Sequence, residues 1–118
     1  MTEDRNSIGL TPANKDYIKI VKDNMKFKDL LAIGKMAFSY ALRMNYDSEI
    51  RSFSEGTTTV WNIGSLDTDH ELFDIVNFLA PDIERPYDYI EAAINVGLKH
   101  LRDLFPSGDI NLISLMDN

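Results

Sequence analysis

Residues 28–45 constrain the fold more than any other stretch of the chain. At about 100° per residue, the charged and hydroxyl side chains of this stretch fall in one narrow sector of a helix, and apolar side chains cover nearly all the rest. A surface helix buries one stripe, whereas a helix that is apolar around most of its circumference must be covered on several sides. The sequence therefore predicts a helix that is covered by its own domain on one side and by a second subunit on the other. The side chains expected at that subunit interface are Leu31, Met36, Phe38 and Leu42.

Gly34 interrupts the apolar surface in the middle of this helix. Glycine inside a helix costs roughly 1 kcal/mol relative to alanine. A close backbone crossing would compensate for that cost, so we expect another segment to pass near Gly34.

The length and composition of the chain are those of an ordinary globular domain. It has 118 residues, enough for one domain with a real core but little surplus, and its apolar and charged fractions are 44% and 26%. It contains no cysteine, which excludes disulfides, thiolate zinc sites and a cysteine nucleophile. The acidic, polar start of the sequence does not resemble a signal peptide, and no apolar run approaches the roughly 18 residues of a membrane span. We therefore expect a cytoplasmic protein.

The net charge of −7 is distributed unevenly along the chain. Residues 1–52 hold nine Lys and Arg against seven Asp and Glu, whereas residues 53–118 hold three against twelve. Such asymmetry indicates either an electrostatic partner for one half or a match between a basic and an acidic face, within one subunit or between subunits. Both interpretations remain open at this point.

The pattern of apolar residues predicts a mainly α, compact four-helix single domain with a short N-terminal extended arm and one short β-like segment. The two best-defined helices besides residues 28–45 are expected at residues 12–24 and from Pro86 to about Phe105. The chain divides into disordered residues 1–6, an arm and two helices over residues 7–45, a loop and extended segment over 46–66, two helices over 67–105, and a docking tail over 106–118.

Caps and anchors mark several boundaries. Thr11 followed by Pro12 predicts the start of the first helix, and Thr68 followed by Glu71 matches a capping box that would open the third. Trp61, in the β-like segment, is expected to be a half-buried anchor. Four large apolar residues of the tail are expected to dock on the body of the domain: Ile110, Leu112, Ile113 and Leu115.

Lysines form a stripe along the first helix. Lys15, Lys19, Lys22 and Lys26 recur at spacings of 4, 3 and 4, so they fall within an arc of about 60°, and Lys28 follows closely. The stripe is compatible with a solvated face, with a phosphate-binding surface, or with a surface for a protein partner. Lysine is a point charge, which suits sequence-independent contact with phosphates better than the reading of bases.

Groups that could perform chemistry are sparse. Residues Asp67–Glu71, with Asp74 one turn later, gather carboxylates and an imidazole that could hold Mg²⁺ or Mn²⁺. However, acids in the first turn of a helix are favoured by the helix dipole, and adjacent helical residues point in different directions. Neither His70 nor His100 has the neighbours of a catalytic triad, and the chain has no phosphate-cradling glycine loop. We predict no metal, no cofactor and no enzymatic activity.

Residues 6–45 resemble half of a ribbon-helix-helix protein, with an extended arm, Thr-Pro, a helix, a tight turn and a second apolar helix. That resemblance implies that the arms of two chains pair as a ribbon, which enters the major groove of DNA.

Most of the chain is also similar to the DndE family, small accessory proteins of bacterial DNA phosphorothioation. The similar features are a lysine-bearing first helix, the segment Ala37–Leu42, Glu55-Gly56, Gly64, Leu72-Phe73, and the pair Gly97 and Leu101. The resemblance implies a compact, mainly helical tetramer that binds DNA through surface lysines, has no catalytic residues and works beside other subunits of a modification complex.

The leading hypothesis is therefore a non-enzymatic accessory protein of a DNA modification system that binds the DNA backbone. The side chains expected to carry the contact are Lys15, Lys19, Lys22, Lys26 and Lys28. One alternative is an oligomeric interaction or scaffold module without nucleic-acid binding. Another is a ribbon-helix-helix regulator, for which the arm supplies Arg5, Asn6 and Ser7 as the only base-reading side chains. The regulator should be a dimer and the DndE-like protein a tetramer.

Overall fold

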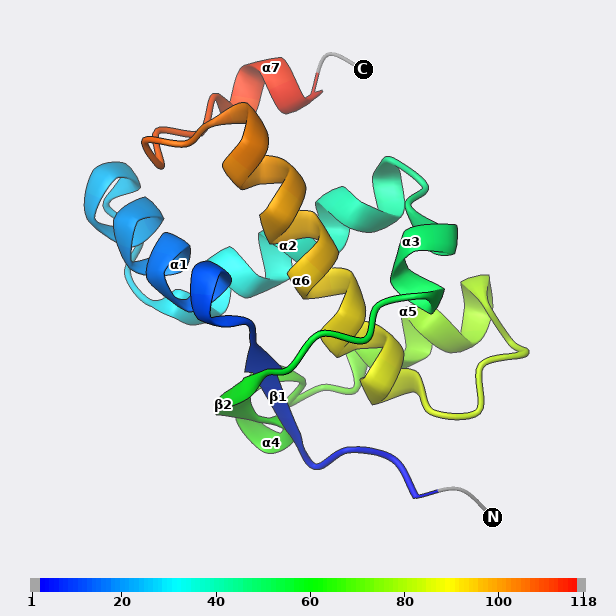
Figure 1. Ribbon diagram of the computed structural model, residues 1–118. Coiled ribbons are helices and arrows are strands. Elements are labelled where there is room, and N and C mark those ends of the chain that lie inside the picture. The colour runs from blue at the N-terminus through cyan, green and yellow to red at the C-terminus, as the bar shows by residue number, and fades with distance from the viewer. Residues whose placement is uncertain (1–2, 117–118) are drawn as a thin grey trace.

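The longest helix, α6 (Pro86–Leu104), lies at the centre of the domain, and the other elements pack around it (Figure 1). The computed structural model describes the backbone of residues 3–116 and the side chains of residues 3–114. Within these residues the fold is mainly α with one small sheet, which confirms the predicted class. The other elements are β1 (Ser7–Leu10), α1 (Pro12–Met25), α2 (Leu30–Arg43), α3 (Asp47–Arg51), β2 (Thr58–Asn62), α4 (Ile63–Leu66), α5 (Glu71–Leu79) and α7 (Leu112–Met116).

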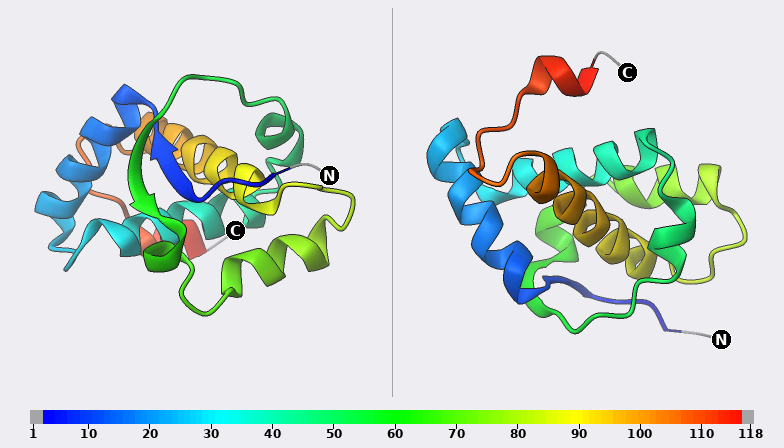
Figure 2. Two further views of the ribbon diagram at one scale, coloured as in Figure 1. Left: turned by 90° about the horizontal axis from the view of Figure 1, so that it is seen from below. Right: turned by 45° about the horizontal axis from the view of Figure 1, so that its top comes forward.

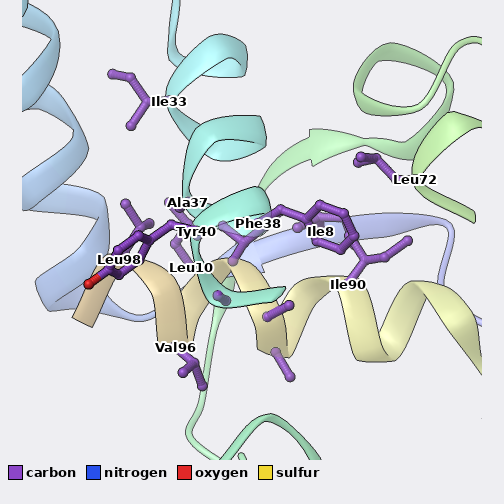
Figure 3. Close-up of a cluster of buried hydrophobic side chains, with 14 of the residues drawn as sticks. Ile8, Leu10, Ile33, Ala37, Phe38, Tyr40, Leu72, Ile90, Val96 and Leu98 are labelled. Atoms are coloured by element: carbon purple, nitrogen blue, oxygen red, sulfur yellow. The ribbon is translucent and has the colours of Figure 1, made fainter. Parts of the chain in front are cut away.

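Within one chain α6, rather than the helix expected over residues 28–45, is surrounded by the other elements, and coverage of that helix by a second subunit stays a prediction. Thirteen of the 19 residues of α6 are buried. Helix α2 packs along α6 with a single face, while Ala32, Lys35 and Ser39 on its other side are exposed. Side chains from α2, α6 and β1 meet in one core cluster (Figure 3).

Two glycines permit the closest packing in this core. A Cβ atom on Gly97 would overlap the carbonyl oxygen of Ala37, so the backbones of α6 and α2 cross there. At Gly34, where a backbone crossing was expected, a Cβ atom would lie 2.8 Å from the indole of Trp61. Trp61 is 9% exposed and thus more deeply buried than predicted. The neighbour that compensates for Gly34 is therefore an aromatic ring rather than a helix backbone.

Strand β1 is occupied on both edges. It pairs antiparallel with β2 on one edge, with a register shift between Ile8 and Gly9. On the other edge the Gly9 N–H donates to Glu91 Oε2 at 2.8 Å, and Asn95 Nδ2 donates to the Gly9 carbonyl at 3.0 Å. The extended arm is confirmed as a strand, but it is paired within its own chain. An intermolecular ribbon of the ribbon-helix-helix kind would require the pairing on one of these edges to break.

The segment before β1 is ordered from residue 3, so the prediction of disorder is wrong for residues 3–6. The Asp4 carboxylate accepts hydrogen bonds from the N–H groups of Tyr87 and Asp88, at 2.8 and 3.1 Å. Arg5 forms ion pairs with Asp88 and Glu91. The first N–H groups of a helix have no intrahelical partner, and a carboxylate at this end also suits the helix dipole. Residues 1–2 lie outside the described part of the chain.

Helix α5 is capped by a different residue from the one predicted. Its start is held by Asp67, which is 4% exposed and accepts from the N–H groups of Leu72 and Phe73 and from the hydroxyl of Tyr87, at 2.9, 3.1 and 2.8 Å. The Thr68 hydroxyl instead donates to the Gly64 carbonyl. Residue 70 has a positive φ of 60°, which turns the chain so that the capping box cannot form.

Two further expectations need correction. The loop expected over residues 46–56 contains the short helix α3, whose Arg51 pairs with Asp47 and Asp82. In the tail, Ile110 is buried, but Leu112 and Ile113 are 42% and 75% exposed, so docking is confirmed only for Ile110. The side chain of residue 115 lies outside the described residues.

No helix within the described residues is both long and apolar enough to cross a membrane.

Candidate nucleic-acid interface

Helix α1 is the scaffold of the predicted phosphate-binding stripe, and it begins as the sequence predicts. The Thr11 side chain accepts a hydrogen bond from the Asn14 N–H at 3.2 Å, and Pro12 occupies the first helical position. These two features fix the start of the helix and hence the direction of every side chain that follows. The buried face of α1 consists of Asn14, Tyr17, Ile18 and Val21.

Hydrogen bonds fasten this buried face to α6 and to the segment after it. The Tyr17 hydroxyl donates to the Phe105 carbonyl, at 2.7 Å, or to the Leu101 carbonyl, at 3.2 Å. Burial raises the pKa of Tyr17 to about 12, an effect that the charge of Arg102 partly offsets. Tyr17 therefore keeps its proton at neutral pH and can act as a donor. Asn14 Nδ2 also donates to Asn95 Oδ1 at 2.9 Å, so α1 is held at both its middle and its start.

The five lysines extend along α1 and the turn that follows it, and we call them the lysine surface (Lys15, Lys19, Lys22, Lys26 and Lys28). Lys19, Lys26 and Lys28 are exposed, and Lys15 and Lys22 are partly buried. Lys26 has a left-handed backbone, with φ of 58°, which ends α1 and begins the turn into α2.

The lysine surface forms no ion pair in the part of the chain that the structure describes. No side chain of the five forms an ion pair or hydrogen bond there, although Arg5, Arg51 and Lys99 all form ion pairs. Asp16 and Asp23 are exposed on the same helix but do not pair with these lysines. The five positive charges are thus available to an external anion.

The helix dipole accounts for only part of this arrangement. A cation near the C-terminus of a helix is stabilised by about 0.3–1 kcal/mol, which gives Lys22 and Lys26 a structural role. Lys15 lies in the first helical turn, where the same dipole disfavours a cation. Like charges spaced three or four residues apart also repel each other. Helix stability therefore does not explain why residue 15 is a lysine, whereas Asp16 and Asp23, three residues before and four after Lys19, partly offset the repulsion there.

The predicted subunit interface on α2 is only partly accessible. Phe38 is 1% exposed and belongs to the core of its own chain, so it cannot also contact a second copy. Leu31, Met36 and Leu42 are partly buried and pack against the same core. Phe38 was misassigned because apolar periodicity shows that a helix is covered but does not identify what covers it.

The structure also brings together a surface that was not predicted from the sequence. The exposed side of α5 and the turn before it carry three apolar and three acidic side chains around one shallow, open hollow of about 650 Å³. We call this the α5 surface, and its members are Asp69, Glu71, Asp74, Ile75, Phe78 and Leu79. A spacing of three and four residues from Ile75 to Phe78 and Leu79 could have indicated it, because Leu72 and Val76 already fill the buried face.

The acidic residues considered above as possible metal ligands do not converge on one point. Asp67 is used as the cap of α5, and no group of three or more potential ligands lies together among the described residues.

The two histidines have separate environments. His70 lies beside Phe73, whereas His100 stacks on Tyr46 with ring centroids 4.0 Å apart and bonds to Glu49 at 2.8 Å. The hydrogen bond from His100 is the main cause of the lowered pKa of Glu49.

Comparison of the chain with protein-family models, with curated proteins and with solved structures finds no match in any of the three.

Proposed function

We propose that this protein binds the phosphate backbone of DNA through the lysine surface. The observation that carries the proposal is that five lysines lie together on α1 and the following turn without an internal partner among the described residues. Binding would release the counterions condensed on the DNA, which is the main source of non-specific affinity. The proposed contact is independent of sequence, because lysines contact phosphates as point charges.

The distribution of charge determines how DNA would be oriented on the protein. Residues 46–118 hold four Lys and Arg against fourteen Asp and Glu, so that part of the molecule repels phosphates. Helices α1 and α5 lie on opposite sides of α6 (Figure 2). DNA is therefore expected to approach from the side of α1 and to remain distant from α5. The acidic remainder also limits affinity to the range of non-specific binding.

Fluorescence anisotropy of a labelled duplex, measured at several salt concentrations, tests the proposal. If all five lysines contact phosphates, the logarithm of the binding constant should fall with the logarithm of salt with a slope of about −4 to −5. Lys19→Gln should weaken binding to every sequence alike and reduce the slope by about one.

A matched control separates local contact from net charge. Asn77→Asp changes the net charge by the same amount as Lys19→Gln but lies on α5, where Asn77 is exposed. This control should leave the salt slope unchanged. If both substitutions weaken binding equally, or if the wild-type protein does not bind at low salt, the proposal fails.

We extend the proposal to a biological setting on the resemblance to the DndE family. The protein would act as a non-catalytic, homo-oligomeric subunit beside the enzymes of a DNA phosphorothioation system. A labelled duplex with a single nick, compared with the intact duplex, tests this extension. Tighter binding to the nick by a tetramer would support it, whereas equal binding would leave only the general backbone contact.

A second candidate function is an interaction module for a protein partner. The observation that favours it is separate from the lysine surface: the α5 surface exposes Phe78 and Leu79 to solvent. The two functions are compatible, because they use opposite sides of the molecule.

A further inference from the structure

Helix α5 is apolar on two sides but is covered on only one. Leu72 and Val76 are 6% and 1% exposed and face the core. Phe78 and Leu79, in the last turn, are 85% and 60% exposed, and Phe78 is the most exposed large apolar side chain among the described residues. Single exposed apolar residues are common, but here Ile75, Phe78 and Leu79 line one hollow together. A contiguous apolar patch of this kind marks an interaction surface.

Acidic residues form the rim of this hollow. Asp69, Glu71 and Asp74 line it beside the three apolar side chains, and none of them forms an ion pair within the described chain. The surrounding sequence strengthens the negative charge, because residues 52–84 contain seven Asp and Glu and no Lys or Arg. The potential at the hollow is therefore negative, which disfavours nucleic acid and anionic lipid as ligands.

A second copy of the same chain does not supply a complementary surface. The basic helix α1 has its apolar face, including Ile18 and Val21, buried in its own core. The exposed apolar tail, with Leu112 and Ile113, belongs to residues 103–118, which contain no Lys or Arg. Ile20, 44% exposed, is a single apolar side chain among the lysines of α1, and Leu31, Met36 and Leu42 of α2 are partly buried against their own core. The described chain therefore offers no fully exposed apolar stripe with a basic flank, so the complementary partner is a different protein.

We propose that the α5 surface binds a basic, amphipathic helical segment of a partner protein. Apolar side chains of the partner, spaced along one helical face, would fill the hollow beside Phe78 and Leu79. Lysines or arginines on the flanks of that helix would pair with Asp69, Glu71 and Asp74. Burial of the aromatic anchor supplies most of the affinity, and the charged rim selects a basic partner and increases the rate of association. The inference is independent of DNA binding by the lysine surface.

The test uses the full chain and a synthetic probe, a fluorescein-labelled amphipathic helix made of lysine and leucine. A leucine and glutamate peptide with the same pattern, and a scrambled lysine and leucine peptide, serve as probe controls. Anisotropy should show saturable binding of the amphipathic basic peptide with one peptide per chain. The two control peptides should bind at least about tenfold more weakly, since either the charge or the apolar face no longer matches.

One single variant and two double variants localise the binding. Phe78→Ala should weaken it about tenfold or more, the loss typical of a buried aromatic anchor. Asp69→Asn with Asp74→Asn should weaken it severalfold and lower its salt dependence. The matched control is Glu55→Gln with Asp103→Asn, which removes the same charge from two exposed residues elsewhere and should change binding less than about twofold.

Three results would overturn the proposal. The first is no saturable binding by about 1 mM peptide, where even a weak complex would form. The second is an equal effect of the two charge-neutralised variants, which would indicate general attraction to an acidic protein. The third is that the wild-type protein sediments as an oligomer that Phe78→Ala converts to a monomer, because the α5 surface would then be a contact between copies of this chain.

Discussion

The lysine surface and the α5 surface show two opposite ways to build a helix on the outside of this domain. Helix α1 buries most of its large apolar side chains and exposes lysines beside Ile20, which is 44% exposed, whereas α5 exposes apolar side chains beside unpaired carboxylates. Both helices pack on α6, from opposite sides (Figures 1 and 2). On α1 the exposed surface is mainly charged, whereas on α5 exposed charges lie beside apolar side chains that no other element covers. We therefore propose a polyanion as the ligand of the first surface and a protein segment as the ligand of the second.

Truncation of one apolar side chain in each helix should give the largest contrast. Ile18 is 1% exposed, so Ile18→Ala should leave a cavity and lower the free energy of unfolding by about 2–5 kcal/mol. Phe78 is 85% exposed, so Phe78→Ala should change it by less than about 0.5 kcal/mol. Urea denaturation followed by circular dichroism measures both. A large loss for Phe78→Ala would mean that Phe78 is covered in solution.

The caps of the two helices should differ in the opposite direction, because removal of the α5 cap should cost more than removal of the α1 cap. Asp67→Ala would leave two backbone N–H groups and the Tyr87 hydroxyl without a partner in a buried place, and we expect a loss of about 2–4 kcal/mol. Thr11→Ala removes one hydrogen bond at the start of α1 and should cost about 1 kcal/mol. The same denaturation experiment compares them. Equal losses would contradict the assignment of Asp67 as the main support of α5.

The attachment of α1 should weaken at alkaline pH. Tyr17 ionises near pH 10 in the unfolded chain but has a pKa of about 12 in the folded one, so the unfolded state releases its proton first. Stability from this group is therefore complete below pH 10 and is lost as the pH rises from 10 to 12. Tyr17→Phe should cost about 1 kcal/mol at neutral pH and should reduce the alkaline slope. Part of the slope should remain, because burial also raises the pKa of Tyr87. An unchanged slope in Tyr17→Phe would contradict this.

The smallest expected effect is that of Lys19. Lys15 and Lys22 lie four residues before it and three after, whereas Asp16 and Asp23 lie three residues before it and four after, so like and opposite charges at helical spacing nearly cancel. Lys19→Gln should therefore change the free energy of unfolding by less than about 0.5 kcal/mol at low and at high salt. Lys35→Gln, on the exposed side of α2, is the control and should have an equally small effect. A clear loss of stability in Lys19→Gln would indicate that Lys19 has a structural role.

Local signals in the sequence predicted most helix boundaries but not the helix at the centre. Thr11 and Pro12 act on neighbouring residues, so the start of α1 could be recognised from the chain alone. The central position of α6 could not be recognised, since Glu91 and Asn95 interrupt its apolar pattern. Both become buried because β1 and the residues on either side of it supply their hydrogen-bond and ion-pair partners. Those partners are more than 80 residues away along the chain.

The lysine surface and the α5 surface also differ in how far each could be predicted from the sequence. The lysine stripe depends on helical spacing, which the sequence contains, whereas the absence of ion pairs to these lysines among the described residues depends on tertiary packing. The α5 surface depends on which of two apolar faces α6 covers. That choice is made by Asp67, because its bonds to Leu72, Phe73 and Tyr87 fix how α5 lies against α6.

The most direct test of the central claim is a titration of the ¹⁵N-labelled protein with an unlabelled DNA duplex at low salt, followed by amide chemical shifts. Binding through the lysine surface predicts shifts that concentrate in residues 15–28 and diminish as salt is added, with residues 71–79 unaffected. If the residues of α5 shift instead, or if no amide shifts at low salt, the protein does not bind DNA through α1 and the proposed function is wrong.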